Sequence, residues 1–189
     1  MFFFDTSVIC DYLTLPERLV KNPDVQERVK KTHQLFEIFK QRDQKDQSKK
    51  LWFYVSAITI TELRKFQRSE DVLSDIVNLV NTGNVVFVDF SKEVAEYLHK
   101  NFTSYLSDNS LREFTANLEK LTDMGAMSAR KWIDDDVKIA GTAKMVRKLD
   151  ALLTGDYKTF LPVAKQMGLP VYYTKDIPVD MFGELKTEW

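Results

Sequence analysis

The chain has 189 residues, of which 44% are hydrophobic and 29% are charged, a composition typical of a globular domain with a substantial core. Its formal net charge of −1 gives no overall basic field of the kind that attracts nucleic acid, although a local basic patch is compatible with that total. One cysteine and two histidines exclude an intramolecular disulfide, a zinc site of several thiolates and a site of three histidines.

The first residues, "MFFFDTSVICDYL", lack a basic region before the apolar run and carry an acid within it, so we do not expect a signal peptide. No apolar run approaches the roughly 20 residues that a membrane-spanning helix needs. We therefore expect a cytoplasmic protein without a membrane partner.

Five short apolar runs, rich in β-branched and aromatic side chains, predict strands at 2–4, 51–55, 85–90, 151–154 and 170–174. Longer segments with helical spacing separate these runs, and few two-residue hairpin signals occur between them. This alternation predicts an α/β fold in which a central parallel sheet carries helices on both faces, a three-layer α/β/α arrangement. We expect residues 1–189 to form a single domain.

The segments between the strands predict several helices. Ser91 is a good N-cap for a helix over 91–102, and the stretch "SDIVNLVNTG" shows helical spacing that ends at Gly83. The segments around 20–50 and 103–132 are longer than simple crossovers need, so we interpret them as helical elaborations. The first should hold a helix through Val29, Leu35, Phe36 and Phe39, and the second a helix through Leu111, Phe114, Leu118 and Leu121.

Acidic residues follow two of the predicted strands. Asp5 ends the first run and Asp156 follows the fourth, so both should lie at the carboxyl edge of a parallel sheet, where ligands gather. Glu62 lies early in a helix that Ser56 can cap, and a further helix should start at three consecutive aspartates, Asp134, Asp135 and Asp136.

Each acid also has an ordinary structural explanation. The three aspartates would favour a helix N-terminus, Asp156 could be a turn residue beside Gly155, and Glu62 could be an exposed helical residue. Asp5 is harder to explain in this way, because its strand is apolar and a buried charge is costly without compensation.

The motifs "FFFDTSVICDYL", "VSAITITELRKF", "DVKIAGTA" and "ALLTGDYKTF", followed by "GLPVYYT", occur in this order over nearly the whole chain. In this order they resemble the PIN-domain nucleases, which include the toxins of type II toxin–antitoxin pairs. The resemblance implies a PIN-like fold and a metal-dependent ribonuclease whose acidic cluster consists of Asp5, Glu62, Asp136 and Asp156.

The resemblance also implies supporting residues. It places hydroxyl groups beside the first acid, at Thr6 or Ser7, and before Gly155, at Thr154. Asp136 is preferred over its neighbours because it lies three residues before "IA", and Asp135 is the alternative if the register differs by one residue. The sequence has Lys158 and Thr159 where many relatives carry a further acid.

Such a cluster calls for a cation. Four ionised carboxylates about 6 Å apart repel by roughly 3 kcal/mol per pair at an effective dielectric constant of about 20. Oxygen ligands select hard ions, so we expect Mg²⁺ or Mn²⁺, which would activate a water for hydrolysis of an RNA phosphodiester. We assign direct metal contacts first to Asp5 and Asp156, with Glu62 and Asp136 holding a second ion, metal waters or the attacking water.

Basic and aromatic residues near the acids could hold the RNA. Each has an ordinary alternative, as a solvated helix residue or a packing residue. The candidates for phosphate contacts are Arg64, Lys65 and Arg68 after Glu62, and Lys138, Lys144, Arg147 and Lys148 on the helix after Asp136; the candidates for base stacking are Tyr157 and Trp132.

A catalytically inactive PIN-fold scaffold that binds RNA or protein is the main alternative. A haloacid-dehalogenase phosphatase would need a second aspartate where Ser7 stands, and a receiver domain would need paired acids near the first strand. If the protein is a toxin, the resemblance implies an antitoxin that threads near the acids, and family members commonly form homodimers; toxins of this kind are usually shorter chains.

Overall fold

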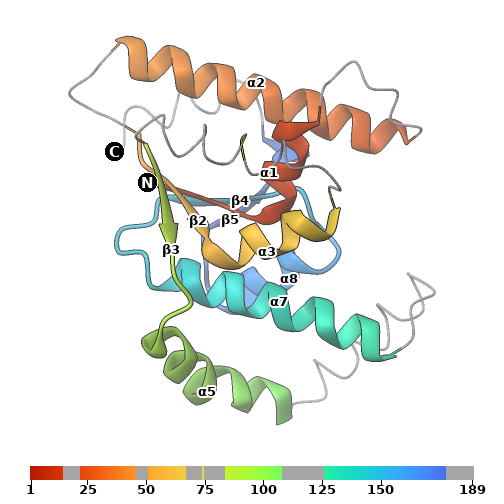
Figure 1. The fold of residues 1–189 in the computed structure, drawn as a ribbon, viewed down its shortest axis with the longest axis vertical. Helices are drawn as coiled ribbons and strands as arrows, with labels where there is room; N and C mark the ends of the chain where they lie inside the picture. The colour runs from red at the N-terminus through yellow and green to blue at the C-terminus, as the bar shows by residue number, and fades with distance from the viewer. Residues whose placement is uncertain (15–21, 46–50, 67–73, 75–83, 108–125, 178–189) are drawn as a thin grey trace.

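A computed structural model describes residues 1–14, 22–45, 51–66, 74, 84–107 and 126–177, with only the backbone described at 43–45, 64–66, 102–107 and 126–132. Five strands and several helices alternate along these residues (Figure 1). The strands are β1 (Phe2–Phe4), β2 (Phe53–Ser56), β3 (Val85–Val88), β4 (Ala151–Thr154) and β5 (Val171–Tyr173). The helices are α1 (Thr6–Leu13), α2 (Pro23–Lys45), α3 (Ala57–Phe66), α5 (Lys92–Ser107), α7 (Ala126–Lys144), α8 (Phe160–Gln166) and the 3₁₀ helix η2 (Thr174–Asp176).

The strands form one sheet in the order β3-β2-β1-β4-β5, with every pair parallel. The predicted α/β fold with a central parallel sheet is therefore confirmed, and each predicted strand lies within two residues of its expected ends. From β1 the chain builds β2 and β3 on one side and later β4 and β5 on the other, so the strand order reverses between β1 and β4. In open α/β sheets this reversal marks the place where ligands bind.

The run of three phenylalanines is explained by the central position of β1. Phe2 and Phe4 lie in the core beneath α1 and α2, whereas Phe3 lies in a second core beneath α7 and α8. All three rings are buried because side chains alternate between faces and both faces are covered. Figure 1 shows α2 and α7 on opposite sides of the sheet, an arrangement compatible with the expected three layers.

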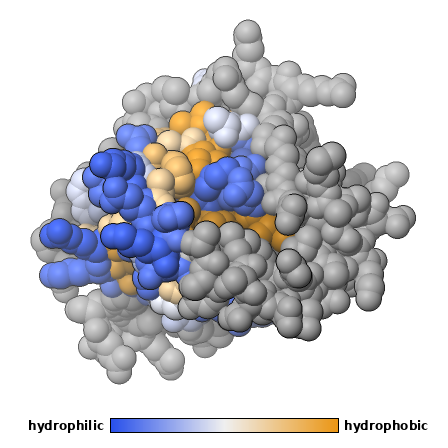
Figure 2. All heavy atoms as spheres, turned by 90° about the horizontal axis from the view of Figure 1, so that it is seen from below, coloured by the Kyte–Doolittle hydropathy of each residue, from blue (hydrophilic) through white to orange (hydrophobic). Residues whose placement is uncertain are grey.

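Helix α5 packs on α7, on the side of α7 away from the sheet (Figure 1). A Cβ at Gly141 would lie 2.9 Å from the Leu98 Cδ2, so glycine permits this close approach. The view from that side shows mostly hydrophilic side chains over the described surface, with a band of apolar side chains between them (Figure 2).

The predicted N-caps are both present. The Val94 N–H donates to the Ser91 hydroxyl at 3.4 Å before α5, and the Ile58 N–H donates to the Ser56 hydroxyl at 3.2 Å at the start of α3. The helix expected through Val29 and Phe39 is α2, which packs directly on the sheet. Two predicted helical segments fall largely outside the described residues. They are the stretch that ends at Gly83, of which only residue 74 is described, and the helix through Leu111 and Leu121, which lies within 108–125.

The prediction that a helix starts at the three aspartates is wrong. Helix α7 begins at Ala126 and places Asp134, Asp135 and Asp136 near its middle. The acids are compatible with a helix interior because Lys138, one turn on, forms ion pairs with the first two. The same helix ends at Lys144, so the placement of Arg147 and Lys148 on it is also wrong; they lie in the turn before β4.

None of the helices in the described ranges is long and apolar enough to cross a membrane.

Candidate active site at the carboxyl edge of the sheet

Asp5 follows β1 directly and caps the helix that comes next. Its Oδ1 accepts a hydrogen bond of 2.7 Å from the Thr6 N–H, and its Oδ2 accepts from the hydroxyls of Ser7 and Thr154, the latter at 2.8 Å. The side chain is buried, with 3% of the residue exposed. The sequence turns from strand to helix at this point because an aspartate in extended conformation can satisfy the first N–H groups of a helix.

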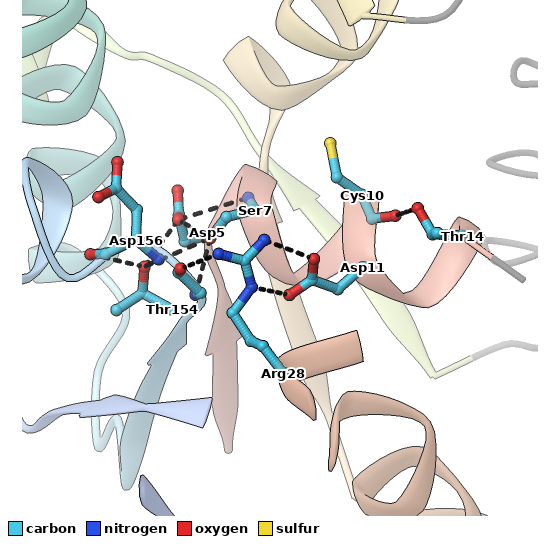
Figure 3. Close-up of polar contacts among 9 residues, drawn as sticks. Asp5, Ser7, Cys10, Asp11, Thr14, Arg28, Thr154 and Asp156 are labelled. Carbon is cyan, nitrogen blue, oxygen red and sulfur yellow. Dashed lines mark hydrogen bonds and ion pairs between the residues drawn. The ribbon is translucent and has the colours of Figure 1, made fainter. Parts of the chain in front are cut away.

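Asp156 lies beside Asp5 because β4 pairs with β1 (Figure 3). The Thr154 hydroxyl links the two segments, since it donates to Asp5 and accepts from the Asp156 N–H at 2.9 Å. Ser7 adds a second link, because its hydroxyl accepts from the Gly155 N–H at 2.8 Å. Ser7 and Thr154, predicted as supporting residues, therefore join α1 to the segment that follows β4.

The carboxylate of Asp156 organises the turn before α8. Its Oδ1 accepts from the N–H groups of Lys158 and Thr159, at 2.8 and 3.0 Å, and its Oδ2 accepts from the Thr159 hydroxyl. The turn-residue explanation thus applies to Asp156, but it does not replace a second role, because the carboxylate is only partly buried and lies next to Asp5.

Glu62 reaches the same place from α3. Its Oε2 accepts a hydrogen bond from the hydroxyl of Thr6, which also lies 3.0 Å from the buried hydroxyl of Thr59. The two threonines connect α1 to α3 through hydroxyl groups and place Glu62 near the residue that Asp5 caps.

Asp136 completes the set from α7. Its Oδ2 is buried and has no hydrogen-bond partner. Burial raises the pKa of Asp136 well above its usual value, and the negative charge of Asp5 adds to this rise, as do those of Asp156 and Glu62 to a smaller extent. The nearby Thr159 hydroxyl opposes the rise. Four segments thus bring Asp5, Asp156 and Glu62 within electrostatic reach of Asp136.

The pKa of Asp5 shows the same coupling. Burial, together with the smaller effects of the negative charges of Asp156 and Glu62, raises the pKa of Asp5 from 3.8 to about 7. The hydrogen bonds from Ser7 and Thr154 act in the opposite direction, since they stabilise the carboxylate. A perturbed carboxyl beside other acids at a strand-order reversal is characteristic of functional sites.

The structure adds a buried ion pair that the sequence analysis missed. Arg28 on α2 donates from Nε and Nη2 to the two carboxylate oxygens of Asp11 on α1, at 2.6 and 2.8 Å, and from Nη1 to the Gly155 carbonyl at 2.7 Å (Figure 3). The guanidinium also interacts electrostatically with the Tyr173 hydroxyl, which extends this contact to the end of β5. Burial raises the pKa of Asp11, and the guanidinium opposes that rise. Arg28 therefore fixes the backbone that precedes Asp156.

Cys10 lies on α1 close to the acids but does not provide a nucleophile. Burial and the negative charges of Asp5 and Asp11 raise the pKa of its thiol to about 12. Because the thiolate is the reactive form, this thiol stays inert near neutral pH.

Two of the predicted RNA-binding cations, Lys138 and Lys144, have partners within the protein. Lys138 pairs with Asp134 at 2.5 Å, and Lys144 donates to the Met167 carbonyl at 2.9 Å, near the end of α8. The side chains of Arg64, Lys65 and Trp132, and all of Arg68, lie outside what the structure describes. Asp135, the alternative to Asp136, interacts with Lys138 at 3.7 Å.

The acids provide the oxygen ligands that a hard cation prefers, but their side chains are not arranged as a complete coordination sphere. Every donor is an oxygen, and the buried Oδ2 of Asp136 has no partner. Among the described residues, however, no three acidic, histidine or cysteine side chains lie close enough to hold one ion together. Hydroxyl groups of Ser7, Thr154 and Thr159 occupy carboxylate oxygens that a cation would use.

Comparisons with protein-family models, with curated proteins and with solved structures found no match. The relation to PIN-domain nucleases therefore stays a prediction from the motifs.

Gly155→Ala should destabilise the protein and displace Asp156. A Cβ at this position would lie 2.8 Å from the Asp11 Oδ2 and 3.0 Å from the Arg28 Nε, both held in the ion pair. We expect a loss of about 1–3 kcal/mol in the free energy of unfolding, measured with urea. Gly141→Ala is the control and should cost less, because the Leu98 side chain that it meets can rotate. Equal stability of Gly155→Ala and wild type would contradict the proposed tight packing.

Asp5→Asn should stabilise the metal-free protein at alkaline pH. The folded protein keeps a proton on Asp5 that the unfolded chain loses, so its stability should fall as the pH rises from about 4 to about 7 and then level off. Asparagine keeps the helix cap and removes the charge. At about pH 8 the variant should be more stable by roughly 1–3 kcal/mol in thermal or urea unfolding. Parallel pH profiles of variant and wild type would show that the charge of Asp5 is not costly.

Proposed function

We propose that the protein is a metal-dependent nuclease of the PIN type that hydrolyses RNA phosphodiester bonds with Asp5, Glu62, Asp136 and Asp156. The observation that carries the proposal is the convergence of these acids, from four separate segments, around a buried carboxylate at the strand-order reversal. The toxin of a toxin–antitoxin pair is the narrower form of the proposal, and it adds an antitoxin as a partner.

The cost of the acidic cluster supports a cationic ligand. Burial opposes ionisation of Asp5 and Asp136, and the negative charges of Asp156 and Glu62 raise the pKa of both carboxyls further. The repulsion between these carboxylates destabilises the metal-free protein, whereas a bound divalent cation would relieve it. The buried Oδ2 of Asp136, which has no hydrogen-bond partner, is the kind of oxygen that such a ligand satisfies.

The residues have distinct roles in this proposal. Asp5 and Asp156, at the carboxyl ends of β1 and β4, would hold the cation, and Asp136 would bind a second ion or a metal water. When bound, Mg²⁺ or Mn²⁺ neutralises charge on the phosphate and makes a bound water more acidic. Glu62 would accept a proton from the attacking water, and the hydroxyls of Thr6 and Thr154 would orient the carboxylates.

The alternative is an inactive scaffold with the same fold. All four positions carry acids, and a scaffold has no need of buried carboxylates that destabilise one another. The nuclease therefore accounts for more of the site. A scaffold would bind its partner equally well with or without the charge of Asp5.

Metal-dependent RNA cleavage should require the four clustered acids and should not require an acid elsewhere at the sheet edge. With Mn²⁺ or Mg²⁺ and a mixed pool of RNA, we expect Asp5→Asn and Asp136→Asn each to lower the cleavage rate by roughly 10²–10³-fold. Asp89→Asn is the matched control, because Asp89 also follows a strand at this edge but is exposed and comes after the edge strand β3. The control should cleave like wild type, and EDTA should stop all cleavage.

Two results would contradict the proposal. If purified wild-type protein shows no metal-dependent cleavage of single-stranded or structured RNA, the scaffold is the better account. If cleavage persists in Asp5→Asn and Asp136→Asn, the activity belongs to another site.

A further inference from the structure

Tyr157 is an exposed aromatic side chain directly beside an acid of the candidate site. With 54% of the residue exposed, it is the most exposed of the large hydrophobic residues in the described part of the chain. The others are Trp52, before β2, Phe90, after the edge strand β3, and Tyr172, within β5. Among these four, only Tyr157 is adjacent in sequence to one of the clustered acids.

Hydrogen bonds to the residues before and after Tyr157 fix the turn that carries it. The Gly155 carbonyl accepts from Arg28, and the Asp156 carboxylate accepts from the N–H groups of Lys158 and Thr159. The Asp156 carbonyl also accepts from the Leu161 N–H at 3.0 Å, which ties the turn to α8. An exposed ring on a fixed turn loses little conformational entropy when a ligand binds.

A second aromatic ring supports Tyr157. The centroid of the Tyr173 ring lies 5.6 Å from that of Tyr157, with an angle of 62° between the ring planes, an edge contact typical of aromatic pairs. The Tyr173 hydroxyl in turn interacts electrostatically with the Arg28 guanidinium. The same arginine therefore fixes the backbone before Asp156 and the ring that supports Tyr157.

A positive charge accompanies the ring. The Lys158 Nζ lies 5.8 Å from the centroid of Tyr157, within the range of a cation–π contact. Single-stranded nucleic acid is recognised by this combination, in which a base stacks on an aromatic ring and a cation contacts the adjacent phosphate. Paired bases in a duplex do not offer a free face for such stacking.

We propose that Tyr157, supported by Tyr173 and flanked by Lys158, is a stacking site for an unpaired RNA base next to the acidic cluster. This inference rests on the proposed function for the identity of the nucleic acid, but its binding step is independent of cleavage. It assigns single-stranded RNA as the substrate class and places one base on the β4–β5 side of the acids.

The test measures binding apart from cleavage. Single-stranded RNA of about 10 nucleotides, labelled with a fluorophore, is titrated in EDTA with full-length Asp5→Asn protein, and the dissociation constant is read from anisotropy. Adding Tyr157→Ala should weaken binding roughly 5- to 150-fold, the range expected for one stacked base. Tyr157→Phe should bind within about twofold of the parent, because it keeps the ring.

Tyr172→Ala is the matched control, since it removes an exposed tyrosine from β5, beside Tyr173. It should leave the dissociation constant unchanged. Melting curves should show that all variants are folded at the temperature of the binding assay, because both rings are largely exposed. Lys158→Gln should reduce the salt dependence of binding by about one phosphate contact. A duplex of the same sequence should bind weakly and not respond to Tyr157→Ala.

The outcomes separate this inference from the proposed function. Loss of binding in Tyr157→Ala but not in Tyr157→Phe supports the stacking site, even if wild-type protein with Mn²⁺ cleaves nothing. Metal-dependent cleavage by wild type together with unchanged RNA binding by Tyr157→Ala would overturn the stacking site and leave the nuclease intact. Failure of the parent protein to bind single-stranded RNA, or equal sensitivity of the duplex to Tyr157→Ala, would also overturn it.

Discussion

The carboxylate of Asp5 is held in the interior at the end of the central strand, and the surrounding residues compensate for that placement. The strand has helices on both faces, and the Asp5 residue that ends it is 3% exposed. The N-terminus of α1 supplies an N–H group, and Ser7 and Thr154 supply hydroxyls. These donors favour the carboxylate, yet burial and two neighbouring acids still raise its pKa to about 7. The charge of Asp5 is therefore only partly compensated by the protein itself, which agrees with the proposed binding of a cation.

The rest of the site depends on how two loops are fixed relative to Asp5. Ser7 and Thr154 connect β1 and α1 to the turn after β4, and Arg28 secures that turn from the opposite side through the Gly155 carbonyl. Glycine is required at 155 because the ion pair of Arg28 and Asp11 leaves no room for a side chain. A buried ion pair of this kind contributes little net stability, since desolvation offsets the attraction. Its value here lies in geometry: one guanidinium sets the position of Asp156 and of the aromatic rings beside it.

Much of this arrangement could be predicted from the sequence, for reasons that are local. The runs at 2–4 and 151–154 are short, apolar and bounded, so their strands and the acids that follow them were predictable. Their adjacency followed from the parallel fold, and the structure confirms it. The start of α7 was predicted wrongly, because consecutive aspartates are common at the N-terminus of a helix. In this protein they lie inside the helix, where Lys138 forms ion pairs with Asp134 and Asp135. The roles of Arg28 and Asp11 were not predicted, because the two residues lie on different helices and nothing in their type or spacing shows that they pair. The same holds for the bond from Arg28 to the Gly155 carbonyl, 127 positions away. Thr159 and Thr59 were missed for the same reason, as their hydroxyl contacts depend on tertiary packing.

The central claim, that the acids bind a divalent cation, is tested most directly by anomalous scattering from a crystal soaked in Mn²⁺ at about pH 8, where Asp5 is ionised. The account predicts an anomalous peak at the carboxyl ends of β1 and β4, with Asp5 and at least one of Asp136 and Asp156 at about 2.0–2.3 Å from the ion. The peak should vanish in Asp5→Asn. A peak only at the exposed acids of α7, Asp134 and Asp135, or none at the sheet edge, would contradict the account.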